Sequence, residues 1–128
     1  MRTIKFRGKS LHTGEWHYGD SVRPNDNTVF IQERGTAGFL SDPETVGQFT
    51  GLLDKNGKEI YEGDIVLSKL RRARKYDEML VICFDDFEWQ GKNANGATTS
   101  LSLLLEYHTI EVIGNIHDNP ELLKGGAE

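Results

Sequence analysis

Residues 50–66 read TGLLDKNGKEIYEGDIV, and this stretch combines strong turn signals with short apolar runs. Asn56-Gly57 lies between the apolar pairs at 52–53 and 60–61. Asn-Gly tolerates the positive φ angles of a tight type I′ turn, so the sequence predicts a β-hairpin here. Glu62-Gly63-Asp64 predicts a second turn, after which residues 65–67 begin a more buried strand.

Further along the chain, residues 79–84 are continuously apolar, which is typical of a central strand covered on both faces. Residues 85–90 are expected to continue that strand, because Phe87 and Trp89 alternate with Asp86 and Glu88. Residues 110–116 predict a further strand. The chain downstream of residue 66 therefore favours a sheet.

The N-terminal part of the chain also has a period of two. Ile4 and Phe6 alternate with Lys5 and Arg7, and the same alternation covers residues 15–18. Both segments predict half-buried strands with one face in water, and residues 29–31 predict a third short strand. We therefore expect a mainly β fold.

Helix is expected only as short turns. A proline near the first helical position favours one turn at 43–47 and another at 120–124, where Pro120 follows a capping sequence. The leucine-rich run 100–107 fits a strand or a short helix, and its periodicity does not decide between them.

The composition describes a small acidic protein. The chain has 128 residues, a formal net charge of -5 and one cysteine, so it has no internal disulfide and no paired-cysteine metal site. No stretch approaches the ~20 apolar residues that span a bilayer. We expect a single domain in the cytoplasm, with no membrane association and no cofactor.

Two long motifs resemble the YopX family, a phage and prophage family without an established activity: TGLLDKNGKEIYEGDIV at 50–66 and EVIGNIHDNPELL at 111–123. Residues 1–8, 16–20 and 42–49 are also similar to it, whereas 67–109 match poorly. The resemblance implies one mainly β domain over 1–128, and homo-oligomers by analogy. We divide the domain into an N-terminal β segment with a connection, 1–48, and a barrel-like segment, 49–128.

The motif residues also make sense as structural elements. A glycine turn followed by an apolar strand, as at 62–67, recurs in small SH3-like barrels, so we expect some SH3-like barrel character. The motif glycines fit turns, bulges or close backbone approaches. The turn residues that we single out are Gly51, Asn56, Gly57, Gly63, Asp64, Gly114, Asn115 and Pro120.

No combination of residues predicts catalysis or metal binding. The four histidines are scattered without a metal-binding spacing, and His117-Asp118 reads as part of a turn. Cys83 lies inside an apolar run and is expected to be inert. Strand alternation would bring together only two of the carboxylates of Asp85-Asp86-Phe87-Glu88, which favours a solvated strand face. We therefore expect a protein that is not an enzyme.

The run KLRRARK at 69–75 carries five of the fifteen basic residues on a predicted hairpin. It could bind phosphates without sequence specificity, with a neighbouring aromatic residue stacking on bases, or it could contact an acidic neighbour in an oligomer. It could also be a solvated loop. The candidate contact residues are Lys69, Arg71, Arg72, Arg74, Lys75 and Tyr76.

Two functions follow from these patterns. The first is a non-enzymatic phage or prophage accessory protein that self-assembles and interacts with a phage or host protein. The alternative is a non-specific nucleic-acid-binding protein that uses the 69–75 hairpin, which the acidic remainder of the chain disfavours.

Overall fold

The computed structural model describes residues 3–70 and 77–125. Strand accounts for 55% and helix for 11% of the structure, which confirms the mainly β class. The chain divides into two compact units, 1–51 and 52–128. The predicted segment boundary at 48/49 and the observed division both fall within one strand, Gly47–Leu53.

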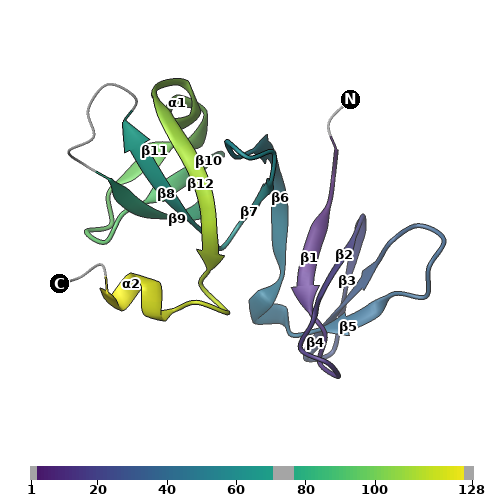
Figure 1. Cartoon of the computed structure of the whole chain (residues 1–128). Helices are drawn as coiled ribbons and strands as arrows, with labels where there is room; N and C mark the ends of the chain where they lie inside the picture. The colour runs from purple at the N-terminus through teal and green to yellow at the C-terminus, as the bar shows by residue number, and fades with distance from the viewer. Residues whose placement is uncertain (1–2, 71–76, 126–128) are drawn as a thin grey trace. The chain divides into compact units, whose positions relative to one another are not determined.

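The first unit contains two small antiparallel sheets (Figure 1). One has the order β2-β1-β6-β7, of which β7 follows residue 51 in the chain, and the other has the order β3-β4-β5. The 3-10 turn η1 follows β5 and is capped by Asp42, whose side chain accepts a hydrogen bond from the Glu44 N–H. The elements are β1 Phe6–Lys9, β2 Trp16–Gly19, β3 Ser21–Asn25, β4 Thr28–Gln32, β5 Phe39–Ser41, η1 Pro43–Thr45 and β6 Gly47–Leu53.

Glycine lets the backbones of the first unit approach closely. A Cβ at Gly19 would lie 2.5 Å from the carbonyl oxygen of Gln32, which accepts a hydrogen bond from the Asp20 N–H. The expected inward face of 4–7 is wrong: Ile4 is exposed, whereas Arg7 is buried, with its guanidinium 4.5 Å from the ring centre of Trp16. Cation–π stacking on Trp16 offsets part of the cost of burying that charge.

The second unit is built on a five-stranded antiparallel sheet of order β11-β10-β9-β8-β12. The strand β7 precedes it and follows the turn that closes the β6–β7 hairpin. Figure 1 shows α2 beyond the end of β12. The elements are β7 Glu59–Tyr61, β8 Asp64–Leu70, β9 Glu78–Asp85, β10 Glu88–Lys92, β11 Thr98–Ser100, α1 Leu101–Tyr107, β12 His108–Asn115 and α2 Glu121–Gly125.

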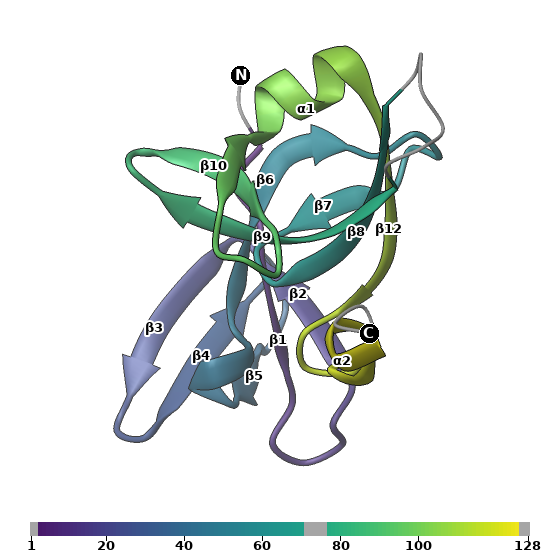
Figure 2. The same ribbon diagram turned by 90° about the vertical axis from the view of Figure 1, so that its left-hand side faces the viewer.

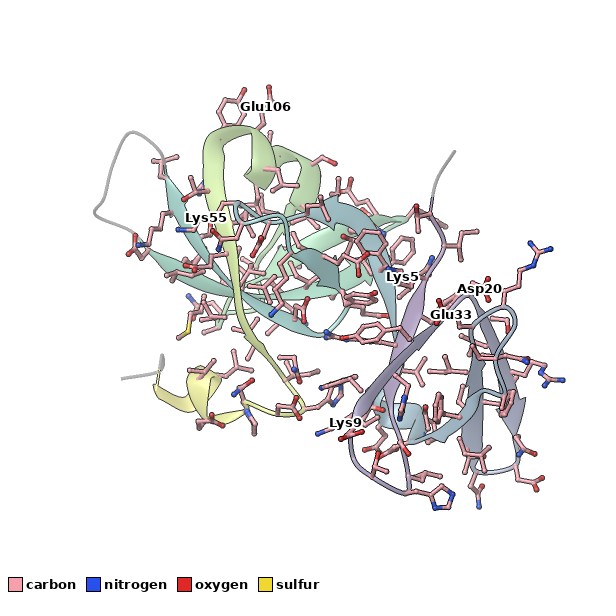
Figure 3. The ribbon with its side chains drawn as sticks, turned by 45° about the vertical axis from the view of Figure 1, so that its right-hand side comes forward. Lys5, Lys9, Asp20, Glu33, Lys55 and Glu106 are labelled. Carbon is pink, nitrogen blue, oxygen red and sulfur yellow. The ribbon has the colours of Figure 1, made fainter. Side chains whose placement is uncertain are left out.

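The core of the second unit lies on one face of this sheet. The leucine-rich run is the helix α1, because Leu101 and Leu104 at a spacing of three both face the core and are buried. Glu106 of the same helix points outward (Figure 3). The expectation that 79–84 is covered on both faces is wrong: Leu80 and Ile82 are buried, and the intervening residues are partly exposed. The core cluster comprises Ile60, Val66, Leu80, Ile82, Leu101, Leu104 and Ile110.

The hairpin between β6 and β7 closes with a three-residue loop rather than a type I′ turn. Gly57 has a φ of 81°, whereas Asn56 does not have a positive φ. The Gly57 N–H donates to the Asp54 carbonyl, and the Asp54 N–H donates to the Lys58 carbonyl. A type I turn followed by a left-handed glycine is the common three-residue hairpin, so the predicted hairpin exists with a different turn.

Asp54 holds this hairpin against β12. Its carboxylate accepts hydrogen bonds from the N–H groups of Asn56, Lys58 and Val112, at 2.8, 2.9 and 2.9 Å. Burial raises the pKa of Asp54, but these three donors outweigh it, and the net pKa is lowered. Lys55 lies beside β12 (Figure 3), where its ammonium is 3.7 Å from the Glu111 carboxylate.

Within residues 3–70 and 77–125, the strands form open sheets, and no closed barrel is found. Among the residues that the structure describes, helix is confined to η1, α1 and α2, the longest of which has seven residues, as expected. Over the described ranges, no helix is long and apolar enough to cross a membrane.

Candidate interaction surface at the β9–β10 hairpin

The turn between β9 and β10 is the most unusual backbone feature of the second unit. Asp85 pairs with Glu88, so the loop has two residues, Asp86 and Phe87, with φ angles of 53° and 64°. Two positive φ angles in a two-residue loop define a type I′ turn. The prediction that 85–90 continues the preceding strand is therefore wrong, because the chain reverses direction at Asp86-Phe87.

Phe87 occupies a position where glycine is favoured. A bulky residue at positive φ is a conformational outlier, and the left-handed region costs roughly 1–2 kcal/mol for a residue with a Cβ. Phe87 is 94% exposed, so burial within the chain does not offset that cost. An outlier of this kind is a reason to look for a function at the turn.

Two further aromatic residues lie behind Phe87 on the same hairpin. Phe84 pairs with Trp89 across the strands, and their rings make an edge-to-face contact at 5.0 Å. Trp89 packs against the core, whereas Phe84 is 52% exposed. We call residues 84–89 the aromatic tip; Figure 2 shows its hairpin running out to one side of the sheet.

The aromatic tip is acidic. Asp85, Asp86 and Glu88 flank Phe87, and the segment has no basic residue. Asp85 accepts a hydrogen bond from the Asp86 N–H at 3.0 Å, and Glu88 accepts one from the Gln90 amide at 3.2 Å. The expectation that Asp86 and Glu88 share one strand face is wrong, because Asp86 lies in the turn. Within 3–70 and 77–125, no group of three His, Cys, Asp or Glu residues could hold a metal ion.

A groove lies along the other half of β9. Its volume is about 800 Å³, and its apolar lining includes Leu67, Met79 and Val81 together with Leu123 of α2. We call it the α2 groove. Its lining also includes Asp77, Glu78 and Lys92.

The predicted basic contact residues are only partly described. Lys69 lies on β8 and is exposed, with its ammonium 3.9 Å from the Asp77 carboxylate. Arg71, Arg72, Arg74, Lys75 and Tyr76 lie outside the described residues.

The predicted turn residues in the 50–66 motif take several structural roles. Gly51 and Gly63 have φ angles of 87° and 89°. Asp64 is buried, and its carboxylate accepts a hydrogen bond from the Tyr61 N–H at 2.7 Å.

The C-terminal motif, residues 111–123, forms a network of hydrogen bonds that fixes a turn after β12. Gly114 lies at a bulge in β12, where a Cβ would be 2.6 Å from Asn119 Oδ1. Asn115 Oδ1 accepts hydrogen bonds from the N–H groups of His117 and Asp118. Pro120 precedes α2, and its carbonyl accepts a hydrogen bond from the Leu123 N–H. His117 is therefore placed within a structural turn.

The sheet holds two candidate reactive groups, the Ser68–His108 pair and Cys83. Ser68 Oγ lies 2.9 Å from His108 Nδ1, a pairing that resembles a nucleophile and its base. Ser68 is only 2% exposed, however, so a substrate has no access to its hydroxyl. Cys83 is partly exposed rather than buried in the core, and desolvation raises its pKa, which disfavours the reactive thiolate.

The alternating pattern of 85–90 contains Phe87 but does not mark it as the tip of a hairpin. Asp-Phe is not a turn signal, so only the pairing of β9 with β10 places it there. The α2 groove and the Ser68–His108 pair were missed because both depend on the relative positions of distant segments. The apolar, partly exposed residues of the groove look like ordinary core positions in the sequence.

Comparison with known proteins gives a family and a fold. The family model described as YopX protein matches residues 5–124. A crystal structure of protein EF1440 from Enterococcus faecalis has a TM-score of 0.57 and 26% identity, covering 96% of this chain and 99% of that chain. The X-ray structure of protein yopX from Bacillus subtilis has a TM-score of 0.63 and 21% identity, covering 96% and 97%. No curated protein matches this chain.

Proposed function

The chain belongs to the YopX family, whose model covers residues 5–124, and from that premise we propose that it is a non-enzymatic accessory protein of a phage or prophage. Its activity is to self-assemble and to bind protein, and its contact surface is the aromatic tip, residues 84–89.

The main support for this contact surface is the position of Phe87. A solvent-exposed phenylalanine at positive φ lowers the stability of the isolated chain, since glycine at the same position would relieve the backbone strain. Burial in a partner reverses this balance, because a phenylalanine ring buries 150–250 Å² on average. Buried aromatic side chains are also the usual energetic centres of protein interfaces.

The charges around Phe87 restrict its partner. Three carboxylates flank the ring, so a polyanion is repelled from the tip and a partner with a basic rim is favoured. The basic run 69–75 of a second copy supplies such charges, and we propose that it contacts an acidic surface of a neighbouring subunit. This reading explains why an acidic protein concentrates five basic residues in one short segment.

The test is the concentration dependence of the sedimentation coefficient for the wild type and Phe87→Ser. We expect the wild type to associate at high micromolar concentration and Phe87→Ser to remain monomeric. Leu103→Ser is the matched control, because it removes another exposed apolar side chain, on α1, and should associate like the wild type. A wild type that stays monomeric, or a Phe87→Ser variant that associates equally, contradicts the proposal.

Non-specific nucleic-acid binding through 69–75 is the alternative, since five basic residues in seven would release counterions from a phosphate backbone. Neutralising Arg71, Arg72 and Arg74 to Gln separates the two functions. Self-assembly predicts weaker association of this variant and no heparin retention by either protein at moderate salt. Nucleic-acid binding predicts salt-sensitive heparin retention that the variant loses.

A further inference from the structure

We propose that Asn95 is a site of spontaneous deamidation, and that Asn56, which lies in a loop of the same geometry, is protected from it. The reaction needs no enzyme, and water is its one co-reactant. Both asparagines precede a glycine, the neighbour that favours this chemistry most. The modification is independent of the aromatic tip and of its partner.

The loops at 54–58 and 93–97 are built alike. In each, the glycine N–H donates to the carbonyl of the first loop residue at 3.0 Å: Gly57 to Asp54, and Gly96 to Asn93. The side chain of that first residue accepts hydrogen bonds from the N–H groups of the third and fifth loop residues, at distances between 2.8 and 3.0 Å. One molecule therefore holds the same reactive pair twice, in the same local conformation.

In deamidation, the backbone nitrogen of the glycine attacks Cγ of the preceding asparagine. A bond forms between this nitrogen and Cγ, the bond from Cγ to Nδ2 breaks, and the leaving nitrogen takes up the proton of the glycine N–H and departs as ammonia. Water then opens the resulting cyclic imide at either carbonyl, which leaves aspartate or isoaspartate. Glycine has no Cβ to obstruct the closing ring, and among the described residues nothing lies within 4 Å of a Cβ built at Gly57 or Gly96.

The closed loop is not the reactive conformation. The attacking nitrogen is held by its hydrogen bond to the first residue of the loop, so the loop must open before this nitrogen reaches Cγ. The rate at each site therefore follows the fraction of time for which its loop is open. That fraction depends on how firmly the loop is tied to the rest of the sheet.

The 54–58 loop is tied to β12 by two hydrogen bonds. Asp54 Oδ2 accepts the Val112 N–H at 2.9 Å, and the Lys55 N–H donates to the Ile110 carbonyl at 2.9 Å. Asp54 is also buried and accepts its hydrogen bonds as a carboxylate, which makes each of them stronger than a bond to a neutral acceptor. Opening this loop breaks all of these bonds.

The 93–97 loop is held more weakly. Its first residue is a neutral asparagine, and Asn93 Nδ2 donates to Glu78 Oε2 on β9 at 3.3 Å, in an exposed position. In the part of the chain that the structure describes, this bond is what ties the loop to another strand. We expect Asn95 to convert roughly tenfold faster than Asn56, because the two bonds to β12 keep the 54–58 loop closed.

Deamidation of Asn95 changes the α2 groove, because Asn93, Ala94 and Asn95 are part of its lining. The aspartate product adds a carboxylate to that lining. The isoaspartate product adds a carboxylate and also lengthens the backbone of the loop by one methylene. The modification thus converts the folded protein into a second form with a more acidic groove.

Peptide mapping by mass spectrometry tests this on the full chain, incubated at pH 8 and digested at intervals. The same protein in guanidinium chloride is the control, since both Asn-Gly pairs are released from their loops when the chain unfolds. We expect similar rates at the two sites in denaturant, and a rate at Asn95 roughly tenfold above that at Asn56 in the folded protein. Asp54→Asn weakens the tie to β12, so it should raise the rate at Asn56 and leave the rate at Asn95 unchanged.

An Asn95 that stays unmodified in the folded protein, after the denatured chain has converted, would overturn the assignment of this site. Equal rates at the two sites of the folded protein, or a faster rate at Asn56, would overturn the protection of the 54–58 loop. So would a folded Asp54→Asn variant in which Asn56 converts at the wild-type rate. Circular dichroism of that variant establishes that it is folded, and the comparison of the two sites within the wild type does not depend on it.

Discussion

Substituting Asp54 by Asn should destabilise the second unit, because Asp54 joins the β6–β7 hairpin to β12. One carboxylate oxygen accepts the Asn56 and Lys58 N–H groups, and the other accepts the Val112 N–H. Hydrogen bonds to a charged group contribute about 1.5–3 kcal/mol each. Asn keeps one acceptor oxygen but presents an amide donor to Val112, so we expect a loss of about 2–3 kcal/mol at pH 7.

The assay is urea unfolding followed by circular dichroism, with amide hydrogen exchange of Val112 as a local readout. The pKa of Asp54 is lowered from 3.8 in the folded protein, so its ionised form stabilises the fold above about pH 4. That contribution is lost as the pH falls through the folded pKa. The difference between wild type and Asp54→Asn should therefore shrink below about pH 4.

Glu106→Gln serves as the control, since Glu106 is exposed on α1 and should leave the urea midpoint unchanged. The account of Asp54 is refuted if Asp54→Asn unfolds at the wild-type midpoint at pH 7, or if the gap between the two proteins stays constant into acid.

Three further results should follow. Gly114→Ala should lower the unfolding midpoint because its Cβ would lie 2.6 Å from Asn119 Oδ1, and adding Asn119→Ala should restore part of the loss; additive losses would contradict this. Leu104→Ala should cost about 2–5 kcal/mol in urea unfolding, whereas Leu103→Ala on the exposed face should cost far less; equal losses would contradict the packing of α1. Cys83 should react with iodoacetamide more slowly than free cysteine at pH 8, because desolvation raises its pKa; a faster reaction would contradict its half-buried position.

Local patterns in the sequence predicted where the strands and turns lie better than they predicted which face of each strand is buried. Gly57 and the prolines of the short helical turns mark changes of chain direction. They do so through the backbone preferences of glycine and proline, which can be read from the sequence. The inward face of β1 was mispredicted because Arg7 is buried against Trp16, and alternation assigns a charged residue to water. Residues 100–107 could not be assigned to helix or strand from the sequence. The assignment depends on the sheet face that the segment covers, and the periodicity of eight residues does not show this.

The candidate site was hidden for a related reason. Asp86-Phe87 has no turn signal, and the surrounding alternation continues the strand pattern through it. Its type I′ geometry is imposed by the pairing of β9 with β10, a tertiary constraint that overrides local preference. The α2 groove depends on β8, β9 and α2 together, so no single segment could reveal it.

The most direct test of the central claim is a paired measurement on Phe87→Gly: its unfolding free energy under monomeric conditions and its association at high concentration. If Phe87 is retained for binding despite its strained backbone, glycine should raise the unfolding free energy by about 1 kcal/mol and abolish association. A Phe87→Gly chain that is less stable than the wild type, or that still associates, would contradict the claim.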